Sequence, residues 1–107
     1  MTDRVVVIGA SGFGRECLDV LDAMVASGAD LHVLGVVDDS PSDANLTRLA
    51  DRGVPFLGTR ADWLATAPIG VRYVLGVGSP AVRRRLVDDL DAAGLPPFTA
   101  VHPSATF

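Results

Sequence analysis

The sequence predicts a single α/β domain in which helices cover both faces of a small, doubly wound parallel sheet. Short apolar runs of strand length alternate with segments in which apolar residues recur every three or four positions. These runs lack polar alternation, as is typical of strands that are buried on both faces. The 107 residues, 49% of them hydrophobic, suit one domain with a real core. Together these features indicate a Rossmann-like arrangement of βαβ units.

The first half of the chain alternates strand, helix and strand. Residues 5–8 are a β-branched run that ends at Gly9, and a second buried strand is predicted at 32–37. Between the two strands, apolar residues recur at helical spacing, and Gly28 marks the end of the helix. The apolar stripe of this helix consists of Cys17, Val20, Leu21, Met24 and Val25.

Shorter elements are predicted in the middle of the chain. A turn cluster at 40–43 leads into a short helix at 46–50, and a further short helix is expected at 61–65. Residues 54–57 are predicted to form a short edge strand, because Pro55 cannot donate a hydrogen bond to a ladder.

The last third of the chain contains the most clearly marked helix. Residues 72–77 form the next buried strand, and Ser79 at the N-cap, followed by a proline, begins a helix that Gly94 ends. Residues 98–102 are predicted to be a last strand. Two exposed ion pairs are expected on the helix from residues four positions apart, Arg84 with Asp88 and Arg85 with Asp89.

Composition limits the classes of partner and the compartment. The formal net charge is −4, whereas nucleic-acid binding depends on clustered Lys and Arg. No apolar run is long enough to span a bilayer, and the N-terminus lacks the basic and apolar regions of a signal peptide. The one cysteine, Cys17, cannot form an internal disulfide, which fits a reducing compartment. We therefore expect a cytoplasmic protein with neither a nucleic-acid partner nor a membrane partner.

The glycine-rich turn after the first strand is the main candidate for a binding site. Its glycines let the backbone turn sharply and approach a ligand without a β-carbon in the way. The free N–H groups and the dipole at the start of the next helix attract an anion. The candidate residues of this turn are Gly9, Ser11, Gly12, Phe13 and Gly14. The alternative is that the glycines only form a tight turn between strand and helix.

Two more segments end strands of the predicted sheet and should lie at the same edge. Asp38 and Asp39 follow the second strand, where a carboxylate commonly accepts hydrogen bonds from a ribose or a base; a solvated turn is the alternative. Gly78 and Ser79 follow the third strand and offer an open backbone and a hydroxyl, which a helix cap would also explain. Arg83 could reach a phosphate, but a salt-bridged surface arginine is the expectation.

The remaining side chains form no catalytic or metal-binding pattern. Cys17 lies on the apolar helical stripe and is interpreted as a small core residue, and His32 as a surface residue at the end of a strand. No His/Cys cluster has the spacing of metal ligands, and no Ser/His/Asp set is indicated. We expect neither catalytic residues nor a metal site in this chain.

The glycine spacing differs from that of dinucleotide-binding proteins. Gly-x-x-Gly-x-Gly replaces Gly-x-Gly-x-x-Gly, and Arg15 stands at the third glycine of an extended Gly-x-x-Gly-x-x-Gly pattern. Arg15 is therefore expected to hinder close packing of the helix on the strand, and the spacing argues against NAD(P). An NAD(P)- or CoA-binding fragment of an oxidoreductase and a non-enzymatic interaction domain are the alternative interpretations.

Several segments, in this order, resemble a known family. They are 7–16, 35–39, 76–79 together with Arg83, and 101–105. The whole chain looks like the N-terminal domain of the sugar O-/N-acyltransferases of the sialic acid O-acetyltransferase and bacillosamine N-acetyltransferase type (NeuD/PglD-like). Phe13 is a departure from this family, because its relatives frequently have histidine there, so an imidazole contact is missing or replaced by apolar packing.

The resemblance implies that 1–101 is a Rossmann-like domain that binds a UDP-sugar, and that 102–107 is a junction to a left-handed β-helix domain absent from this chain. In such a domain the substrate would be contacted by Ser11, Gly12 and Phe13 from the loop, by Asp38 and Asp39 at the uracil and ribose, and by Gly78. The β-helix would bind acetyl-CoA, form a trimer and supply a histidine general base. The chain by itself would hold no cofactor and would be inactive as an acetyltransferase.

Overall fold

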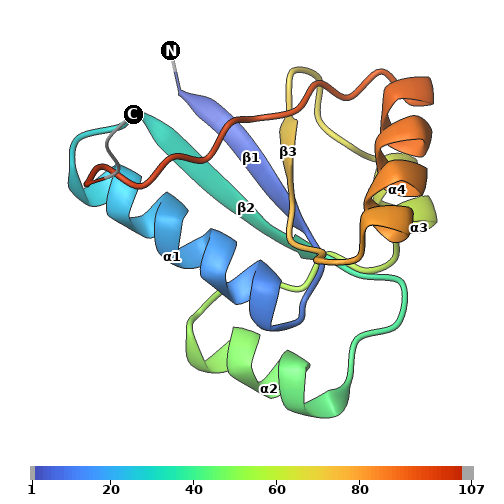
Figure 1. The fold of residues 1–107 in the computed structure, drawn as a ribbon, viewed down its shortest axis with the longest axis horizontal. Coiled ribbons are helices and arrows are strands. Elements are labelled where there is room, and N and C mark those ends of the chain that lie inside the picture. Colours follow the sequence, from blue (N-terminus) through green and yellow to red (C-terminus); the bar gives the residue numbers. More distant parts are fainter. Residues whose placement is uncertain (1, 105–107) are drawn as a thin grey trace.

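A computed structural model describes residues 2–104, and Figure 1 shows strands and helices alternating along the chain. The elements are β1 (Asp3–Ile8), α1 (Gly12–Ala26), β2 (Leu31–Val37), α2 (Asp43–Asp51), α3 (Arg60–Leu64), β3 (Arg72–Leu75) and α4 (Pro80–Ala92). The three strands are parallel and lie in the order β2-β1-β3. The predicted α/β, Rossmann-like fold is therefore confirmed. Of the predicted junction at 102–107, residues 105–107 lie outside the described part of the chain.

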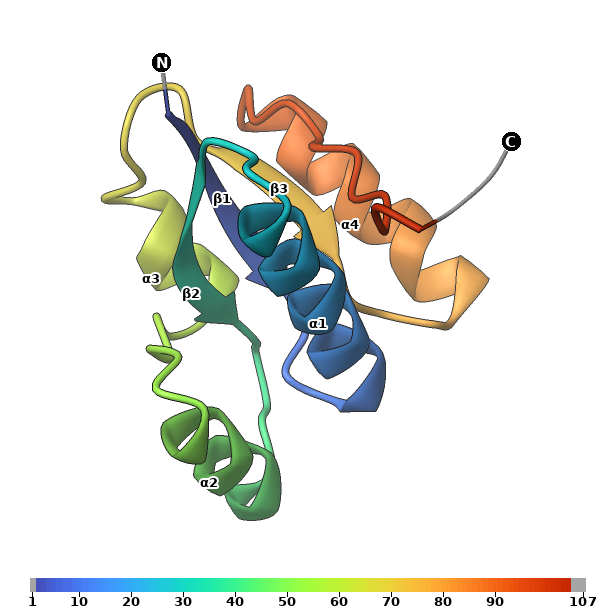
Figure 2. The ribbon, with the colours of Figure 1, turned by 90° about the vertical axis from the view of Figure 1, so that its left-hand side faces the viewer.

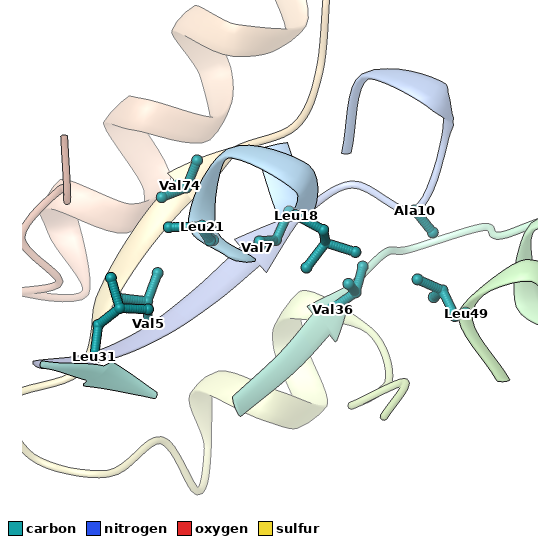
Figure 3. Close-up of a cluster of buried hydrophobic side chains, with 9 residues drawn as sticks. All are labelled: Val5, Val7, Ala10, Leu18, Leu21, Leu31, Val36, Leu49 and Val74. Atoms are coloured by element: carbon teal, nitrogen blue, oxygen red, sulfur yellow. The ribbon is translucent and has the colours of Figure 1, made fainter. Parts of the chain in front are cut away.

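Helices cover both faces of the sheet, with α1 on one face and α3 and α4 on the other (Figure 2). The α1-side core contains Val5, Val7, Ala10, Leu18, Leu21, Leu31, Val36, Leu49 and Val74 (Figure 3). The α4-side core contains Val6, Ile8, Val37, Trp63, Val71, Tyr73, Leu86, Leu90 and Leu95. Successive residues of β1 enter opposite cores because side chains alternate along a strand. The sheet is thus doubly wound, as predicted.

The predicted edge strand at 54–57 is wrong, because only Phe56 forms an isolated bridge, with Val36. The Val36 amide donates to the Pro55 carbonyl at 3.0 Å, and the Leu57 amide donates to the Val36 carbonyl at 2.8 Å. Pro55 has no N–H with which to extend the pairing backwards. In the other direction the Asp38 backbone amide donates to the carbonyl of Gly58 at 3.1 Å, which breaks the regular ladder.

The predicted last strand at 98–102 is also wrong, since pairing stops after one isolated bridge between Tyr73 and Pro97. The Tyr73 backbone amide donates to the Pro96 carbonyl at 3.2 Å, and the Phe98 amide donates to the Tyr73 carbonyl at 2.8 Å. Two residues further along β3, the Leu75 carbonyl accepts instead from the Cys17 thiol at 3.7 Å and from the Arg83 guanidinium. Side chains therefore take the place of a fourth strand.

The two ion pairs expected within α4 do not form in the described part of the chain. Asp89 pairs with Arg60 of α3, with Nη1 and Oδ2 2.7 Å apart. The start of the helix agrees with the sequence prediction, since Ser79 is the N-cap, its hydroxyl accepts from the Val82 amide at 3.4 Å, and Pro80 follows.

Candidate functional site

The turn between β1 and α1 is built on very close backbone contacts. A β-carbon at Gly14 would lie 2.0 Å from the Gly9 carbonyl oxygen, and one at Gly9 would lie 2.5 Å from the Gly76 carbonyl oxygen. Gly9 also has a φ of +119°, which favours glycine. The fold itself therefore requires Gly9, Gly14 and Gly76, which pack the first turn of α1 against the carboxyl ends of β1 and β3.

This packing corrects the expectation for Arg15. The close approach of helix to strand takes place at Gly14, and the Arg15 side chain is directed elsewhere, donating to the Asn45 side-chain oxygen at 2.8 Å. Gly9 and Gly14 therefore correspond to the first and third glycines of the dinucleotide pattern. Ser11 stands where that pattern has its middle glycine, the one that lets the backbone approach a pyrophosphate.

Gly12 and Gly78 differ from the other glycines of the site, because the fold does not require them. The nearest atom to a β-carbon at Gly12 would be Arg15 Nη2, at an ordinary 3.5 Å, and nothing lies within 4 Å of one at Gly78. Neither glycine has a positive φ. Both are exposed, so a side chain at either position would meet solvent or a ligand.

The N-terminus of α1 is open. Ser11 is the N-cap with an extended backbone, and its side chain makes no capping hydrogen bond. The first hydrogen bond of the helix runs from the Arg15 amide to the Ser11 carbonyl at 3.0 Å. Within residues 2–104, the amides of Gly12, Phe13 and Gly14 have no hydrogen-bond acceptor. Three donors and the positive end of the helix dipole are thus available at the carboxyl edge of the sheet.

Asp38 ties the glycine turn to β2. Its Oδ2 accepts from the Ala10 amide at 2.8 Å, and its Oδ1 accepts from the Ser40 amide at 2.8 Å. A carboxylate oxygen can accept more than one hydrogen bond, so Asp38 retains acceptor capacity while it holds the loop.

Asp39 is turned toward α3, where it forms a chain of ion pairs with Arg60 and Asp89. Asp39 Oδ1 accepts from the Arg60 amide at 2.8 Å, and Oδ2 accepts from Arg60 Nε at 3.0 Å. The hydrogen bond from the Arg60 backbone, aided by the guanidinium, lowers the pKa of Asp39. The Asp89 and Asp39 carboxylates raise the pKa of Arg60, so the guanidinium stays charged.

A cavity of about 140 Å³ lies at this edge and collects part of the predicted site. We call it the edge cavity; it is lined by Ile8, Gly9, Val37, Asp38, Asp39, Arg60, Val77, Val82 and Leu86. Its walls are apolar except at the two carboxylates and the guanidinium. Arg60 is a residue that sequence reasoning missed, because nothing in the chain near position 60 signals its pairing with a carboxylate 21 residues earlier.

The other predicted residues lie outside the edge cavity. Phe13, 44% exposed, lines a larger groove of about 570 Å³ between α1 and α4. Ser11, Gly12, Gly78 and Ser79 line neither the edge cavity nor this groove, and the Ser79 hydroxyl caps α4. The structure thus brings together Gly9, Asp38 and Asp39, and the open terminus of α1 follows Gly9 directly in the chain.

Arg83 is not the salt-bridged surface residue that was expected. It is half-buried, and its Nη1 donates to the Val77 carbonyl at 2.9 Å and to the Leu75 carbonyl at 3.5 Å. Cys17 is half-buried against the α1-side core, and burial raises the pKa of its thiol, which keeps it protonated near neutral pH. His32 is exposed on β2, as expected.

Two features are absent from residues 2–104. No cluster of His, Cys, Asp and Glu side chains has the arrangement of a metal site. None of the helices in this range has both the length and the apolar character that crossing a bilayer demands.

Comparison with known proteins places the chain in a family. No curated protein matches it significantly. Residues 4–90 match the family described as the PglD N-terminal domain. This match spans the glycine turn, both aspartates and most of α4. The chain therefore belongs to the family of N-terminal domains of PglD/NeuD-type acyltransferases.

Proposed function

We propose that this domain holds the nucleotide part of a UDP-sugar for an acyltransferase, at the carboxyl edge of the sheet. Membership of the PglD N-terminal domain family supports an acyltransferase that acts on a small-molecule substrate. The edge itself supports a ligand that carries both an anionic group and a flat ring, because an open helix terminus adjoins a small apolar cavity with polar groups.

In this proposal the diphosphate lies over the first turn of α1, held by the amides of Gly12, Phe13 and Gly14. An exposed negative charge at a helix N-terminus gains roughly 0.3–1 kcal/mol, and a partly buried one gains up to about 2 kcal/mol. The observation that carries the proposal is Gly12, a glycine that the fold does not require, at a terminus with unpaired amides. Its missing side chain leaves the approach to those amides open.

The nucleoside occupies the edge cavity in this proposal. At about 140 Å³ the cavity is smaller than the roughly 300 Å³ at which whole-ligand pockets begin, so it suits one ring system of a longer molecule. Asp38 and Asp39 keep lone pairs that can accept from ribose hydroxyls or a base N–H. The sugar then extends away from the cavity, past the helix terminus.

The acyl transfer itself takes place elsewhere in this proposal. A left-handed β-helix domain binds acetyl-CoA, forms the trimer and supplies a histidine base. The base removes a proton from the sugar amine or hydroxyl as that group attacks the thioester carbonyl, and CoA leaves as the thiolate. The present domain contributes affinity and orientation for the sugar nucleotide in the cytoplasm.

The first experiment titrates UDP, to millimolar concentration, into ¹⁵N-labelled protein and follows the backbone amides. We expect shifts at 11–14 and at 38–39. Gly12→Val should weaken UDP binding at least tenfold, since its side chain blocks the phosphate, while the spectrum stays folded. Ala44→Val is the control, because it also places a valine at an exposed position in the first turn of a helix, here α2.

Two outcomes would contradict the proposal. One is the absence of any shift at 11–14 at millimolar UDP. The other is an equal loss of affinity in Gly12→Val and Ala44→Val, which would show that the effect does not come from blocking the approach at Gly12. A titration with NADH in parallel tests the oxidoreductase alternative directly, because saturable NADH binding without UDP binding would favour it.

A further inference from the structure

Arg60 lines the edge cavity while two carboxylates hold its guanidinium in place. Its Nε donates to Asp39 and its Nη1 donates to Asp89, at 3.0 and 2.7 Å. Its Nη2 has no hydrogen-bond acceptor among residues 2–104. The Arg60 side chain is 26% exposed, so this nitrogen belongs to a well-packed but accessible group.

The geometry of a guanidinium places this free donor beside an acceptor. Nε and Nη2 share one edge of the planar group, so the Nη2 protons lie next to the Asp39 carboxylate that Nε already engages. Asp39 Oδ2 accepts one hydrogen bond from Arg60 and has capacity for another. Arg60 and Asp39 therefore offer a donor and an acceptor side by side, and both residues line the edge cavity together with Val77, Val82 and Leu86.

We propose that Arg60 is a specificity-determining residue, which reads the edge of the uracil base together with Asp39. Uracil offers an imide N–H flanked by carbonyl groups, and in this pairing the N–H donates to Asp39 while the neighbouring carbonyl accepts from Arg60 Nη2. The ring lies between the apolar side chains of the cavity. This inference rests on the proposed function, and adds to it a residue and the base atoms that it contacts.

Asp89 acts as a positioning residue in this arrangement. Asp89 does not itself line the edge cavity, but its carboxylate accepts from Nη1 of Arg60 and so limits rotation of the guanidinium. Asp88, its neighbour on α4, is exposed and has no ion pair in the described part of the chain. Asp88 therefore provides a control with the same charge on the same helix.

The experiment compares four proteins: wild type, Arg60→Lys, Asp89→Asn and Asp88→Asn. Calorimetry gives the affinity of each for UDP, for UDP methylated at the imide nitrogen N3, and for inorganic pyrophosphate, which lacks a base. Arg60→Lys keeps the positive charge and loses the planar fork. We expect it to weaken UDP binding about tenfold, the usual scale for a paired base contact, and to leave pyrophosphate binding unchanged.

The other two variants and the methylated nucleotide each have an expected result. Asp89→Asn should weaken UDP binding at least about twofold without changing pyrophosphate binding, and Asp88→Asn should change neither. The methylated nucleotide should bind wild type about tenfold more weakly than UDP does, and this preference should shrink in Arg60→Lys. Thermal midpoints that match wild type exclude a general loss of structure.

The possible failures are distinguishable. If wild type binds no UDP, both the proposed function and this inference are overturned. If wild type binds UDP but Arg60→Lys keeps the same ratio of UDP to pyrophosphate affinity, only this inference is overturned. It is also overturned if Arg60→Lys weakens UDP and methylated UDP equally, because Arg60 would then contact the ribose or phosphate.

Discussion

At Gly14 the first turn of α1 lies so close to β1 that a β-carbon would be 2.0 Å from a backbone carbonyl oxygen, whereas at Gly12 the nearest atom would be 3.5 Å away. Two glycines of one loop thus have different physical reasons to be glycine. The first is required by packing within the protein. The second leaves space that the protein itself does not use. At the scale of single residues, this difference separates the demands of the fold from those of a ligand.

The two glycines should respond very differently to alanine. Gly14→Ala is expected to lower the free energy of unfolding by about 3 kcal/mol or more, because the new methyl group meets backbone that cannot move aside. Gly12→Ala should change it by less than about 1 kcal/mol, since alanine favours the helix and meets only the end of a flexible side chain. Urea denaturation measures both values, and equal stabilities of the two variants would mean that the tight packing at Gly14 is not what requires glycine there.

Asp39 should give stability that depends on pH in a defined direction. Arg60 holds the pKa of the folded carboxyl below its ordinary value of 3.8, so the contribution is complete only above about pH 5. It is lost as the pH falls further, through the lowered pKa. Asp39 is half-exposed, so we expect less than about 1 kcal/mol.

Thermal melts of wild type and Asp39→Asn between pH 6 and pH 2.5 measure this contribution. The wild type should be the more stable at pH 6, and the difference should disappear toward pH 2.5. A difference that grew as the pH fell would mean that folding raises the pKa of Asp39 instead of lowering it.

At the scale of elements, buried strands and well-capped helices could be predicted from the sequence. The β-branched run at 5–8 lies within β1. Ser79 is the N-cap of α4, as the serine followed by a proline predicts. The strand predictions were wrong where contacts with residues distant in the sequence decide the structure. The segments at 54–57 and 98–102 have strand-like composition, yet each forms only one bridge. Pro55 and the hydrogen bond from the Asp38 amide to Gly58 limit the first, and side chains that bond to the Leu75 carbonyl limit the second.

In the candidate site too, features set by the local sequence could be predicted, and features set by distant contacts could not. Parallel strands must end at one edge, and Gly9, Asp38 and Asp39 do line one cavity there. The roles of the two carboxylates could not be predicted, because Asp38 bonds to Ala10 and Asp39 bonds to Arg60 across long stretches of chain. The ion pair expected between Arg85 and Asp89 failed for the same reason, since Arg60 reaches Asp89 from another helix.

For the molecule as a whole, the sheet joins two cores that share no side chain. Leu21 of α1 lies in one core and Leu90 of α4 in the other, and both are completely buried. Because neighbouring residues of β1 enter opposite cores, loss of packing on one face should loosen the strand that supports the other. We therefore expect the two faces to unfold as one cooperative unit.

The only tryptophan, Trp63, lies in the α4-side core and makes this expectation testable. Leu21→Ala and Leu90→Ala should each lower the free energy of unfolding by about 2–5 kcal/mol, the usual result of truncating a buried leucine. In each variant the urea transition followed by Trp63 fluorescence should coincide with that followed by far-ultraviolet circular dichroism. A Leu21→Ala protein whose fluorescence transition stayed at the wild-type midpoint would mean that the α4-side core holds together without the α1 side. The sheet would then connect two separately stable layers, and the edge cavity, which lies on the α4 side, would keep its shape when α1 is loosened.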